Sequence, residues 1–455
     1  TGNRITCRDW FQLCLKEGLT VFRDQQFTSD MRSAPVKRIE DVIQLRARQF
    51  PEDQGPLSHP VRPESFQEIN NFYTSTVYEK GAEVIGMLKR LVGDARYAAA
   101  LDLYFARHDG QACTIEDWLQ VFEDATGRDL SQFKRWYSPS GTPRISVREE
   151  WQDGTFTLPL SQQTAPTPGQ PDKQPQVIPD AVGLLHPNGD EVVPTQVLEL
   201  TETAQSFRFD GLAARPVPSI LRGFSAPVVL DHDIDGARRA FLLAHDTDPF
   251  NRWESGRELA RATLVEMVTA SAAPDAAYLE GRRGVLAEDT LDPAYRALML
   301  GQPSQSELAG VLHERGTPPD PDAIHTASEE LRDAKADALS DMLPTLYAAH
   351  QVTGPFRPDA QAAGQRSLAN AALSLLTRLD GGATAQSQYD SADNMTLQLA
   401  ALGALLDAGK GGSVLADFYD QWRQLGCFFL VAKCALDHNR NCHNALLIIK
   451  IQNVI

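Results

Sequence analysis

The chain has 455 residues, 42% of them hydrophobic, and 43 basic against 60 acidic side chains give a formal net charge of −17. This length predicts about two to four domains with sizeable cores, which excludes disorder for most of the chain. Excess negative charge repels phosphate backbones and anionic lipids, so nucleic acids and membrane surfaces are not expected as partners. No run approaches the roughly 18 apolar residues that span a bilayer, so we expect a soluble protein.

The first ten residues, TGNRITCRDW, include neither an initiator methionine nor a hydrophobic signal core. We therefore expect the chain to be a fragment of a longer protein. Cys7, Cys14 and Cys113 are scattered through sequence with helical character. Scattered thiols in a large chain are typical of a reducing compartment, so a cytoplasmic location is expected.

Residues 1–141 carry the signals of a mostly helical segment. Thr6, Thr76 and Thr114 each stand three positions before an acidic residue, which is the pattern of a capping box, and apolar residues follow at helical spacing. The proline-rich stretch 50–63 is predicted to interrupt these helices as a long loop.

Residues 142–233 change from helical spacing to alternation of apolar and polar residues. Hairpin turns are predicted at 152–154 and 187–190, a further short apolar run lies at 220–224, and the Pro/Gln-rich stretch 164–175 is predicted as a surface loop. Many short strands with turns between them predict a β-sandwich.

Residues 234–426 are rich in Ala and Leu, with helix signals separated by Pro and Gly breaks, and predict a helical array. The predicted fold class is therefore multidomain α+β, a helical part followed by a β-sandwich and a helical domain. Residues 427–455 change composition abruptly. Their Cys and His residues do not have zinc-finger spacing, so we interpret this tail as foreign sequence and not as a metal site.

Glu17 is the first candidate functional residue. It follows Trp10 and Leu13 at helical spacing, on the face that the pattern buries. A buried carboxylate must be paired, hydrogen-bonded or bound to a metal, and a salt bridge to Arg4 or Arg8 is the simpler alternative.

Tyr78 is the second candidate. If Thr76 caps a helix, Tyr78 lies in its first turn, where a phenol could donate a hydrogen bond to a developing oxyanion. Tyr73 could line an adjacent pocket, although aromatic side chains beside a helix start more often belong to a core.

Several ordered stretches of the chain resemble the zinc aminopeptidase N family in its bacterial branch. The longest are LKEGLTVFRD at 15–24 and VYEKGAEVI at 77–85, with CRDWFQL at 7–13 and NNFYT at 70–74 beside them. Further matches extend the resemblance to about Trp422, at 1–4, 135–137, 140–143, 224–228, 251–254 and 394–396.

The resemblance implies that residues 1–141 are the C-terminal part of a thermolysin-like catalytic domain. In that family two His of an H-E-x-x-H helix and a Glu on the next helix bind one zinc ion, and Glu17 matches this Glu. Tyr78 matches the catalytic tyrosine that stabilises the oxyanion, and Tyr73 is similar to a residue lining the pocket for the first substrate side chain. Asp24 could be an acid that orients a His ligand.

The family's H-E-x-x-H and G-x-M-E-N motifs are both missing from the 455 residues. Counting back from Glu17 would place the two His ligands just before Thr1. The resemblance thus implies a parent protein that is a monomeric zinc metallo-aminopeptidase acting on peptides with a free N-terminus, and a fragment that is inactive by itself. Two alternatives stay open: a non-catalytic relative that serves as a binding scaffold, and a related hydrolase that acts on an epoxide.

Overall fold

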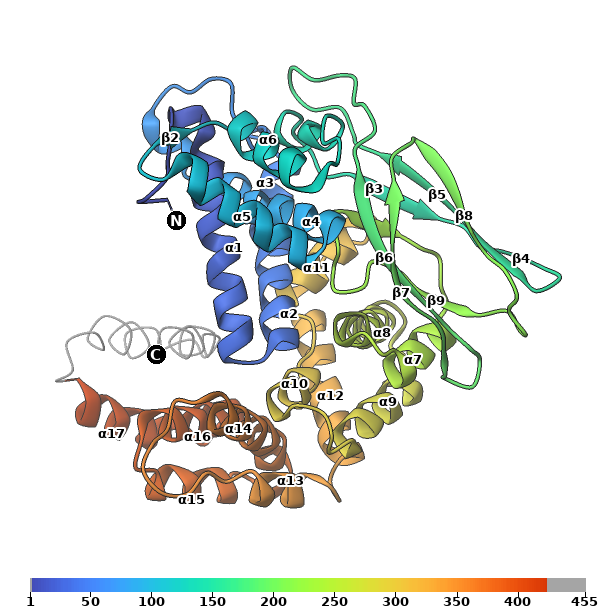
Figure 1. Cartoon of the computed structure of the whole chain (residues 1–455). Helices are drawn as coiled ribbons and strands as arrows, with labels where there is room; N and C mark the ends of the chain where they lie inside the picture. The colour runs from blue at the N-terminus through green and yellow to red at the C-terminus, as the bar shows by residue number, and fades with distance from the viewer. Residues whose placement is uncertain (1, 424–455) are drawn as a thin grey trace. The chain divides into compact units, whose positions relative to one another are not determined.

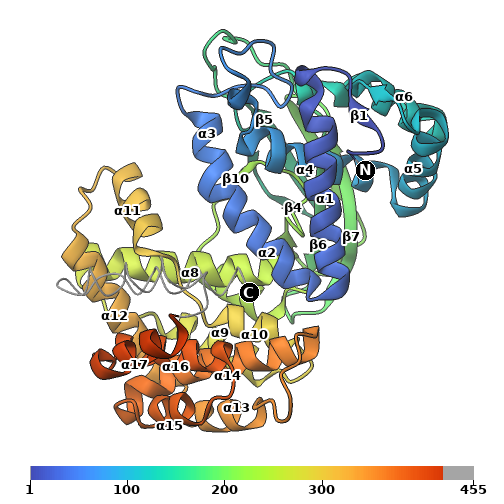
Figure 2. The ribbon, with the colours of Figure 1, turned by 90° about the vertical axis from the view of Figure 1, so that its left-hand side faces the viewer.

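The computed structural model describes residues 2–423 and divides into two compact units, Thr1–Ser255 and Gly256–Ile455 (Figure 1). The first unit begins with a mostly helical part in which α1 runs beside α2 (Figures 1 and 2) and also packs against α4. Its elements are β1 (Thr6–Cys7), η1 (Trp10–Gln12), α1 (Leu13–Met31), α2 (Ala34–Gln44), η2 (Leu45–Gln49), α3 (Phe50–Gln54), η3 (Ile69–Phe72), η4 (Thr76–Lys80), α4 (Gly81–Val92), α5 (Asp94–His108), β2 (Ala112–Cys113), α6 (Ile115–Thr126) and η5 (Phe133–Tyr137).

The capping box predicted at Thr114 is confirmed. The Thr114 hydroxyl accepts a hydrogen bond from the Asp117 N–H at 3.1 Å, and the Asp117 carboxylate accepts one from the Thr114 N–H at 2.8 Å. This exchange satisfies donors that the first turn of a helix leaves free, so α6 begins at Ile115.

The helix start predicted at Thr6 is wrong. Thr6 lies in strand β1, where its N–H bonds to the carbonyl of Gln111 at 3.1 Å, and Asp9 is the residue that caps the following turn. Trp10, predicted on the buried face, is 43% exposed. Pairing with a segment far along the chain overrides the local signal here, because each strand satisfies the other's backbone groups.

The loop predicted at 50–63 is wrong for its first five residues. Phe50–Gln54 forms α3, continuous with α2 through η2, a wider π-helical turn, and the irregular stretch begins at Gly55. The wider turn comes just before Pro51, which lacks an N–H and cannot continue the ordinary hydrogen-bond ladder. Buried Phe50 and Asp53 hold this short helix in place.

Two β-sheets follow in the same unit. Strand β10 pairs with β3 in parallel, β5 pairs with β3, β4 and β8 in antiparallel fashion, and β6 lies between β7 and β9 in the second sheet. Every residue of β6 is buried, as expected for a strand at the centre of a domain. The strands are β3 (Arg144–Val147), β4 (Glu150–Gln152), β5 (Thr155–Gln163), β6 (Ile178–Leu185), β7 (Glu191–Leu200), β8 (Ala204–Phe209), β9 (Val217–Ser219) and β10 (Val229–Asp231), after which α7 (Gly236–His245) begins.

The two predicted hairpin turns are confirmed. Asp153 and Gly154 have φ of 47° and 82°, the left-handed pair that a two-residue hairpin needs, and Gly189 has φ of 96°. The apolar run 220–224 is not a strand, and that prediction is wrong. Leu221 and Phe224 there have positive φ, and the segment is held by the Asp180 carboxylate, which accepts the Leu221 N–H at 2.8 Å.

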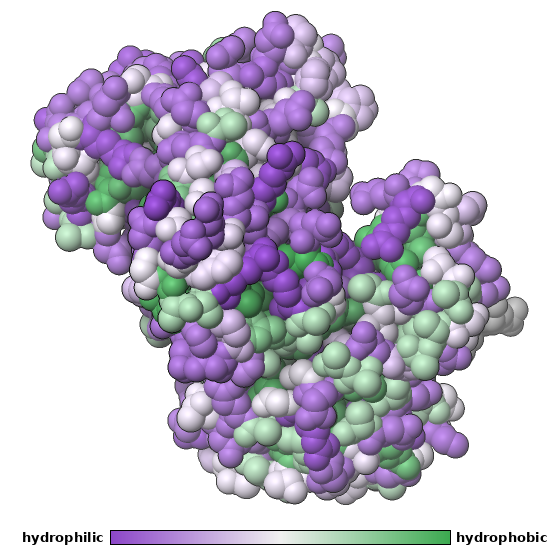
Figure 3. Space-filling model, turned by 90° about the vertical axis from the view of Figure 1, so that its right-hand side faces the viewer, coloured by the Kyte–Doolittle hydropathy of each residue, from purple (hydrophilic) through white to green (hydrophobic). Residues whose placement is uncertain are grey.

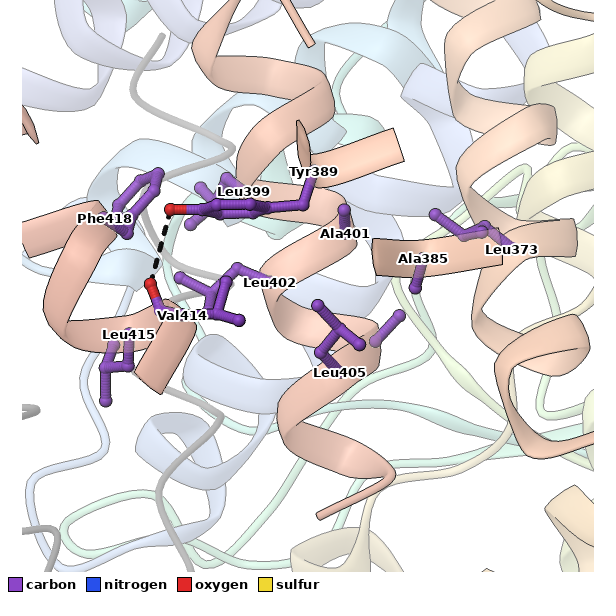
Figure 4. Close-up of a cluster of buried hydrophobic side chains, with 11 residues drawn as sticks. Leu373, Ala385, Tyr389, Leu399, Ala401, Leu402, Leu405, Val414, Leu415 and Phe418 are labelled. Atoms are coloured by element: carbon purple, nitrogen blue, oxygen red, sulfur yellow. Dashed lines mark hydrogen bonds between the residues drawn. The ribbon is translucent and has the colours of Figure 1, made fainter. Parts of the chain in front are cut away.

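The second unit is helical, and its helices enclose two clusters of buried apolar side chains. Figure 4 shows one of them, where Tyr389 packs with Leu402 and Phe418 and donates its hydroxyl hydrogen to the carbonyl of Val414 at 3.3 Å. Helix α8 (Pro249–Ala270) runs across the division between the units, and α9 (Ala276–Ala287), α10 (Pro293–Met299), α11 (Gln305–Glu314), α12 (Pro321–Ala338), α13 (Leu343–Ala349), α14 (Ala360–Asp380), α15 (Ala383–Ser391), α16 (Met395–Asp407) and α17 (Gly412–Trp422) follow.

This order of folds confirms the predicted fold class, whereas the boundaries 142, 234 and 427 stay predictions. The tail predicted at 427–455 lies outside the described residues. Within 2–423, no helix is both long enough and apolar enough to cross a bilayer. Hydrophilic residues cover most of the face shown in Figure 3, with hydrophobic groups between them.

Candidate active site

Glu17 lies on the second turn of α1, where its side chain is 15% exposed. Its carboxylate forms an ion pair with the neighbouring Lys16. The alternative that Glu17 is a salt-bridge partner of Arg4 or Arg8 is wrong, because both arginines form ion pairs with other acidic residues. Glu17 is thus a largely buried carboxylate whose ion-pair partner is the preceding residue of the helix.

Two glycines let α1 approach the turn that carries Tyr78. A Cβ atom placed on Gly18 would lie only 2.8 Å from the carbonyl carbon of Gly81, and one on Gly81 would lie 3.3 Å from the Cα of Gly18. A side chain at either position would force the two backbones apart. The glycine that follows Glu17 is therefore what allows Glu17 to lie next to this turn.

Tyr78 lies in the middle of η4, a π-helical turn, and not in the first turn of a helix capped by Thr76 as predicted. Thr76 is inside the turn, and both its N–H and its hydroxyl donate to the Glu52 carboxylate, at 2.7 and 2.6 Å. The Glu52 carboxylate thus accepts the Thr76 N–H, the role that the predicted capping box gave to Glu79. Single π-helical turns are rare and often occur at functional sites, because they turn one side chain away from the regular helical register.

The structure brings Tyr78, Glu17 and Tyr73 together. Burial, followed by the charge of Glu17 and its hydrogen bond, raises the pKa of the Tyr78 phenol to about 12. The rings of Tyr73 and Tyr78 lie with centroids 6.2 Å apart, and Tyr73 is 51% exposed. The result is a half-buried neutral phenol next to a carboxylate, with an exposed aromatic ring beside them.

Asp24 does not join this group. It is exposed, and it lies seven residues beyond Glu17 on α1, so about 10 Å separates the two along the helix axis. Its role as an acid that orients a ligand stays a prediction.

Sequence analysis missed Asp53 and Lys80, which form a buried ion pair of 2.6 Å between α3 and the last residue of η4. The Lys80 and Asp53 side chains are 2% and 0% exposed. Burial alone would raise the pKa of Asp53, but the ammonium of Lys80 and hydrogen bonds lower it below its ordinary value. A signal was available, since Lys80 continues the apolar spacing of Val77, Val84 and Leu88, and a buried lysine must have a partner.

A zinc site would need further ligands beside Glu17. A carboxylate oxygen is a suitable zinc ligand, so the chemistry and partial exposure of Glu17 fit one position of such a site. Within residues 2–423, no three His, Cys, Asp or Glu side chains come together as a metal site would require. Glu17 is therefore the one ligand that this group of residues offers.

A cavity of about 350 Å³ lies elsewhere in the first unit, with Arg90, Arg222 and Asp248 in its wall. Arg222 is already paired with Glu191 and Asp246. Neither Glu17 nor Tyr78 lines this cavity, so it is distinct from the candidate site.

Comparisons with known proteins assign the chain to a family. The peptidase family M1 domain matches residues 1–137, an Ig-like domain of unknown function (DUF3458) matches 141–233, and a domain of unknown function with ARM repeats (DUF3458_C) matches 236–428. Aminopeptidase N of Caulobacter vibrioides is 46% identical over 93% of the chain, and that of Escherichia coli is 41% identical over 94%. The chain belongs to the aminopeptidase N family. The resemblance found in the sequence is thereby confirmed.

The chain spans about half the length of the aminopeptidase N relatives that it matches, 50% of the Caulobacter protein and 51% of the Escherichia protein. A solved structure, that of Legionella pneumophila aminopeptidase A in complex with aspartic acid, is similar over 92% of this chain and 49% of its own, with 27% identity and a TM-score of 0.78. Glu17 and Tyr78 both lie in the part matched by the family M1 domain.

Proposed function

We propose that this chain is part of a zinc metallo-aminopeptidase that removes single residues from the free N-termini of peptides. The proposal is supported most directly by the proximity of Glu17 and Tyr78, which the packing of α1 against η4 brings together although they lie far apart in the sequence of an aminopeptidase N family member. A hydrolase of this class needs a metal ligand and an oxyanion donor on the same side of the substrate, and these two side chains have the chemistry for both roles.

In this proposal Glu17 is one zinc ligand, and the other ligands come from residues outside 2–423. Bound zinc would lower the pKa of a water molecule and polarise the substrate carbonyl. The Tyr78 hydroxyl would donate a hydrogen bond to the carbonyl oxygen as negative charge develops on it. A phenol with its ordinary pKa of about 10 is protonated at physiological pH, so Tyr78 can act as a neutral hydrogen-bond donor.

Tyr73 is the proposed wall of the pocket for the first substrate side chain. Its ring is 51% exposed and close to that of Tyr78. An apolar side chain of the first substrate residue could therefore pack on this ring, next to the carbonyl that reacts. Asp24 is proposed to orient a zinc-binding histidine. We also propose a cytoplasmic monomer, from the scattered thiols and the resemblance.

The test requires the coding sequence to be extended upstream of Thr1 in the source genome and the longer protein to be expressed. Release of a fluorophore from aminoacyl amides is measured with and without a zinc chelator. We expect chelator-sensitive activity that falls on the order of 100 to 1,000-fold in Tyr78→Phe, since one oxyanion donor contributes about this factor. Glu17→Gln should lose zinc as well as activity.

Tyr97→Phe is the matched control. Tyr97 is 3% exposed, and its hydroxyl has no hydrogen-bond partner among the described residues, so the same substitution there removes a phenolic hydroxyl from the same part of the fold without touching the site. Full activity in Tyr78→Phe would disprove the assigned role. An extended protein that binds no zinc would instead favour the non-catalytic scaffold.

A further inference from the structure

Tyr78 lies on a turn that is held at both ends by consecutive residues of α3. At the first end, the Glu52 carboxylate accepts the N–H and hydroxyl of Thr76. At the other end, the Asp53 carboxylate accepts a hydrogen bond from the Lys80 ammonium at 2.6 Å. Adjacent carboxylates on one short helix thus fix the first and last residues of η4, with Tyr78 between them.

The Asp53–Lys80 pair also binds the segment that leads into the β-sandwich. The second Asp53 oxygen accepts the N–H of Gly141 at 2.7 Å, and the Thr142 hydroxyl donates to Asp53 at 3.0 Å. Lys80 donates to the carbonyl of Gly141 at 3.0 Å. Both Asp53 oxygens accept hydrogen bonds and the Lys80 ammonium donates two, so the buried pair is held in one geometry by several partners.

Gly141 is packed closely against the loop at 164–175. It has φ of 93°, a conformation that L side chains rarely adopt, and a Cβ atom there would meet Thr164 and Thr167 at 3.1 and 3.2 Å. Lys173, in the same loop, donates to the carbonyl of Ser140 at 2.9 Å. The Pro/Gln-rich loop predicted at 164–175 thus packs over Ser140 and Gly141, on the side of the ion pair that faces the β-sandwich.

We propose that Asp53 and Lys80 are positioning residues that hold Tyr78 in its catalytic orientation, and that they do so by fastening the π-helical turn to the first residues of the β-sandwich. The inference rests on the proposed function, because Tyr78 must be the oxyanion donor for its orientation to matter. Neither Asp53 nor Lys80 touches the substrate in this scheme. Their effect on the reaction passes entirely through Tyr78.

A double-mutant cycle in the extended, active protein tests this dependence. Removing one partner alone would leave a buried charge, so Asp53→Asn and Lys80→Met are combined. We expect the pair of substitutions to lower kcat on the order of 100-fold, the usual consequence of displacing a reacting group by about 1 Å, with little change in KM. In a Tyr78→Phe background the same pair should cost less than about threefold.

Asp246→Asn is the matched control. The Asp246 and Arg222 side chains form an ion pair of 3.1 Å and are 0% and 2% exposed, and none of their hydrogen bonds within residues 2–423 reaches η4. Asp246→Asn should change kcat by the same small factor with and without Tyr78. If Asp53→Asn/Lys80→Met costs the same factor in both backgrounds, the two residues act on stability alone and the inference is overturned. The single substitution Lys80→Arg, which keeps the positive charge beside Asp53, should retain more of the wild-type kcat than Asp53→Asn/Lys80→Met does.

A second measurement does not depend on activity and uses the 455-residue chain itself. The protein is labelled with 3-fluorotyrosine, and the fluorine resonance that is missing in Tyr78→Phe is assigned to Tyr78. We expect that resonance to move in Asp53→Asn/Lys80→Met and to keep its position in Asp246→Asn. An unmoved Tyr78 resonance would refute the inference even in a protein without aminopeptidase activity, and an inactive extended protein with a moved resonance would refute the proposed function alone.

Discussion

Gly18→Ala should destabilise the first unit, although alanine is the better helix former. The new Cβ atom would lie 2.8 Å from the carbonyl carbon of Gly81 and 3.1 Å from its Cα and oxygen, all of them backbone atoms that cannot rotate away. An ordinary contact of 3.4 Å requires α1 and the first residue of α4, which directly follows η4, to separate by about 0.6 Å. Overpacking of this kind costs about 1–3 kcal/mol, against a helix-propensity gain of at most ~1 kcal/mol.

Gly86→Ala provides the control within the same unit. Gly86 lies in α4, and the atoms closest to its Cβ would be side-chain atoms of Phe22 and Arg90 at 3.5 and 3.7 Å, which are ordinary contacts. We expect Gly86→Ala to leave the free energy of unfolding unchanged or to raise it by up to ~1 kcal/mol. The same change in residue type should therefore have opposite signs at the two positions.

Urea unfolding followed by tryptophan fluorescence measures both effects, because Trp118 and Trp136 are fully buried in the first unit and report on its core. If Gly18→Ala proves as stable as the wild-type chain, the close approach of Gly18 and Gly81 does not limit the structure. In the extended protein, Gly18→Ala should also lower aminopeptidase activity at least about tenfold, because the same separation moves Glu17 away from Tyr78.

Two further predictions concern buried charges. Burial raises the pKa of Asp180 to about 7, so the free-energy cost of burying its charged form is absent at low pH and complete above pH 7. The free energy of unfolding should therefore fall from pH 4 to pH 7. Asp180→Asn should flatten this dependence in urea unfolding at pH 5 and pH 8. An equal slope in both proteins would contradict this. Burial and nearby arginines lower the pKa of Lys335 well below its ordinary value, and its ammonium donates only to the carbonyl of Leu300 at 3.0 Å among the described contacts. Lys335→Met should therefore raise the free energy of unfolding of the second unit at pH 7, and this gain should shrink at pH 10. A wild-type chain that is more stable than Lys335→Met at pH 7 would refute the reasoning.

The sequence alone predicts elements whose signals are local. The Thr114–Asp117 capping box, the turn at Asp153–Gly154 and the apolar stripe that contains Ile85 and Leu88 each depend on residues within one or two turns, and each is confirmed. Thr6 shows where this fails. Its neighbours satisfy the rules for a helix start, but its N–H pairs with Gln111, and no local pattern contains that partner.

In the candidate site, too, the sequence identified some residues and missed others. Glu17 and Tyr78 were candidates from their positions in the sequence, and a resemblance that spans whole segments suggested their roles, whereas the residues that bring them together were not found. Gly18 and Gly81 matter only because they face one another, and Asp53 lies in a stretch whose proline predicts a loop. Contacts between distant segments decide these positions, so the sequence could signal that Lys80 needs a partner but not which residue it is.

The buried Asp53–Lys80 pair has a consequence for how the protein can be divided in the laboratory. Family models separate the chain between residues 137 and 141, and a cloning plan based on them would end the first piece at Tyr137. That piece would lose Gly141 and Thr142, which supply three of the hydrogen bonds around the pair, and two opposite charges would be left facing water. The compact unit Thr1–Ser255 keeps these contacts, because it contains both the helical part and the β-sandwich.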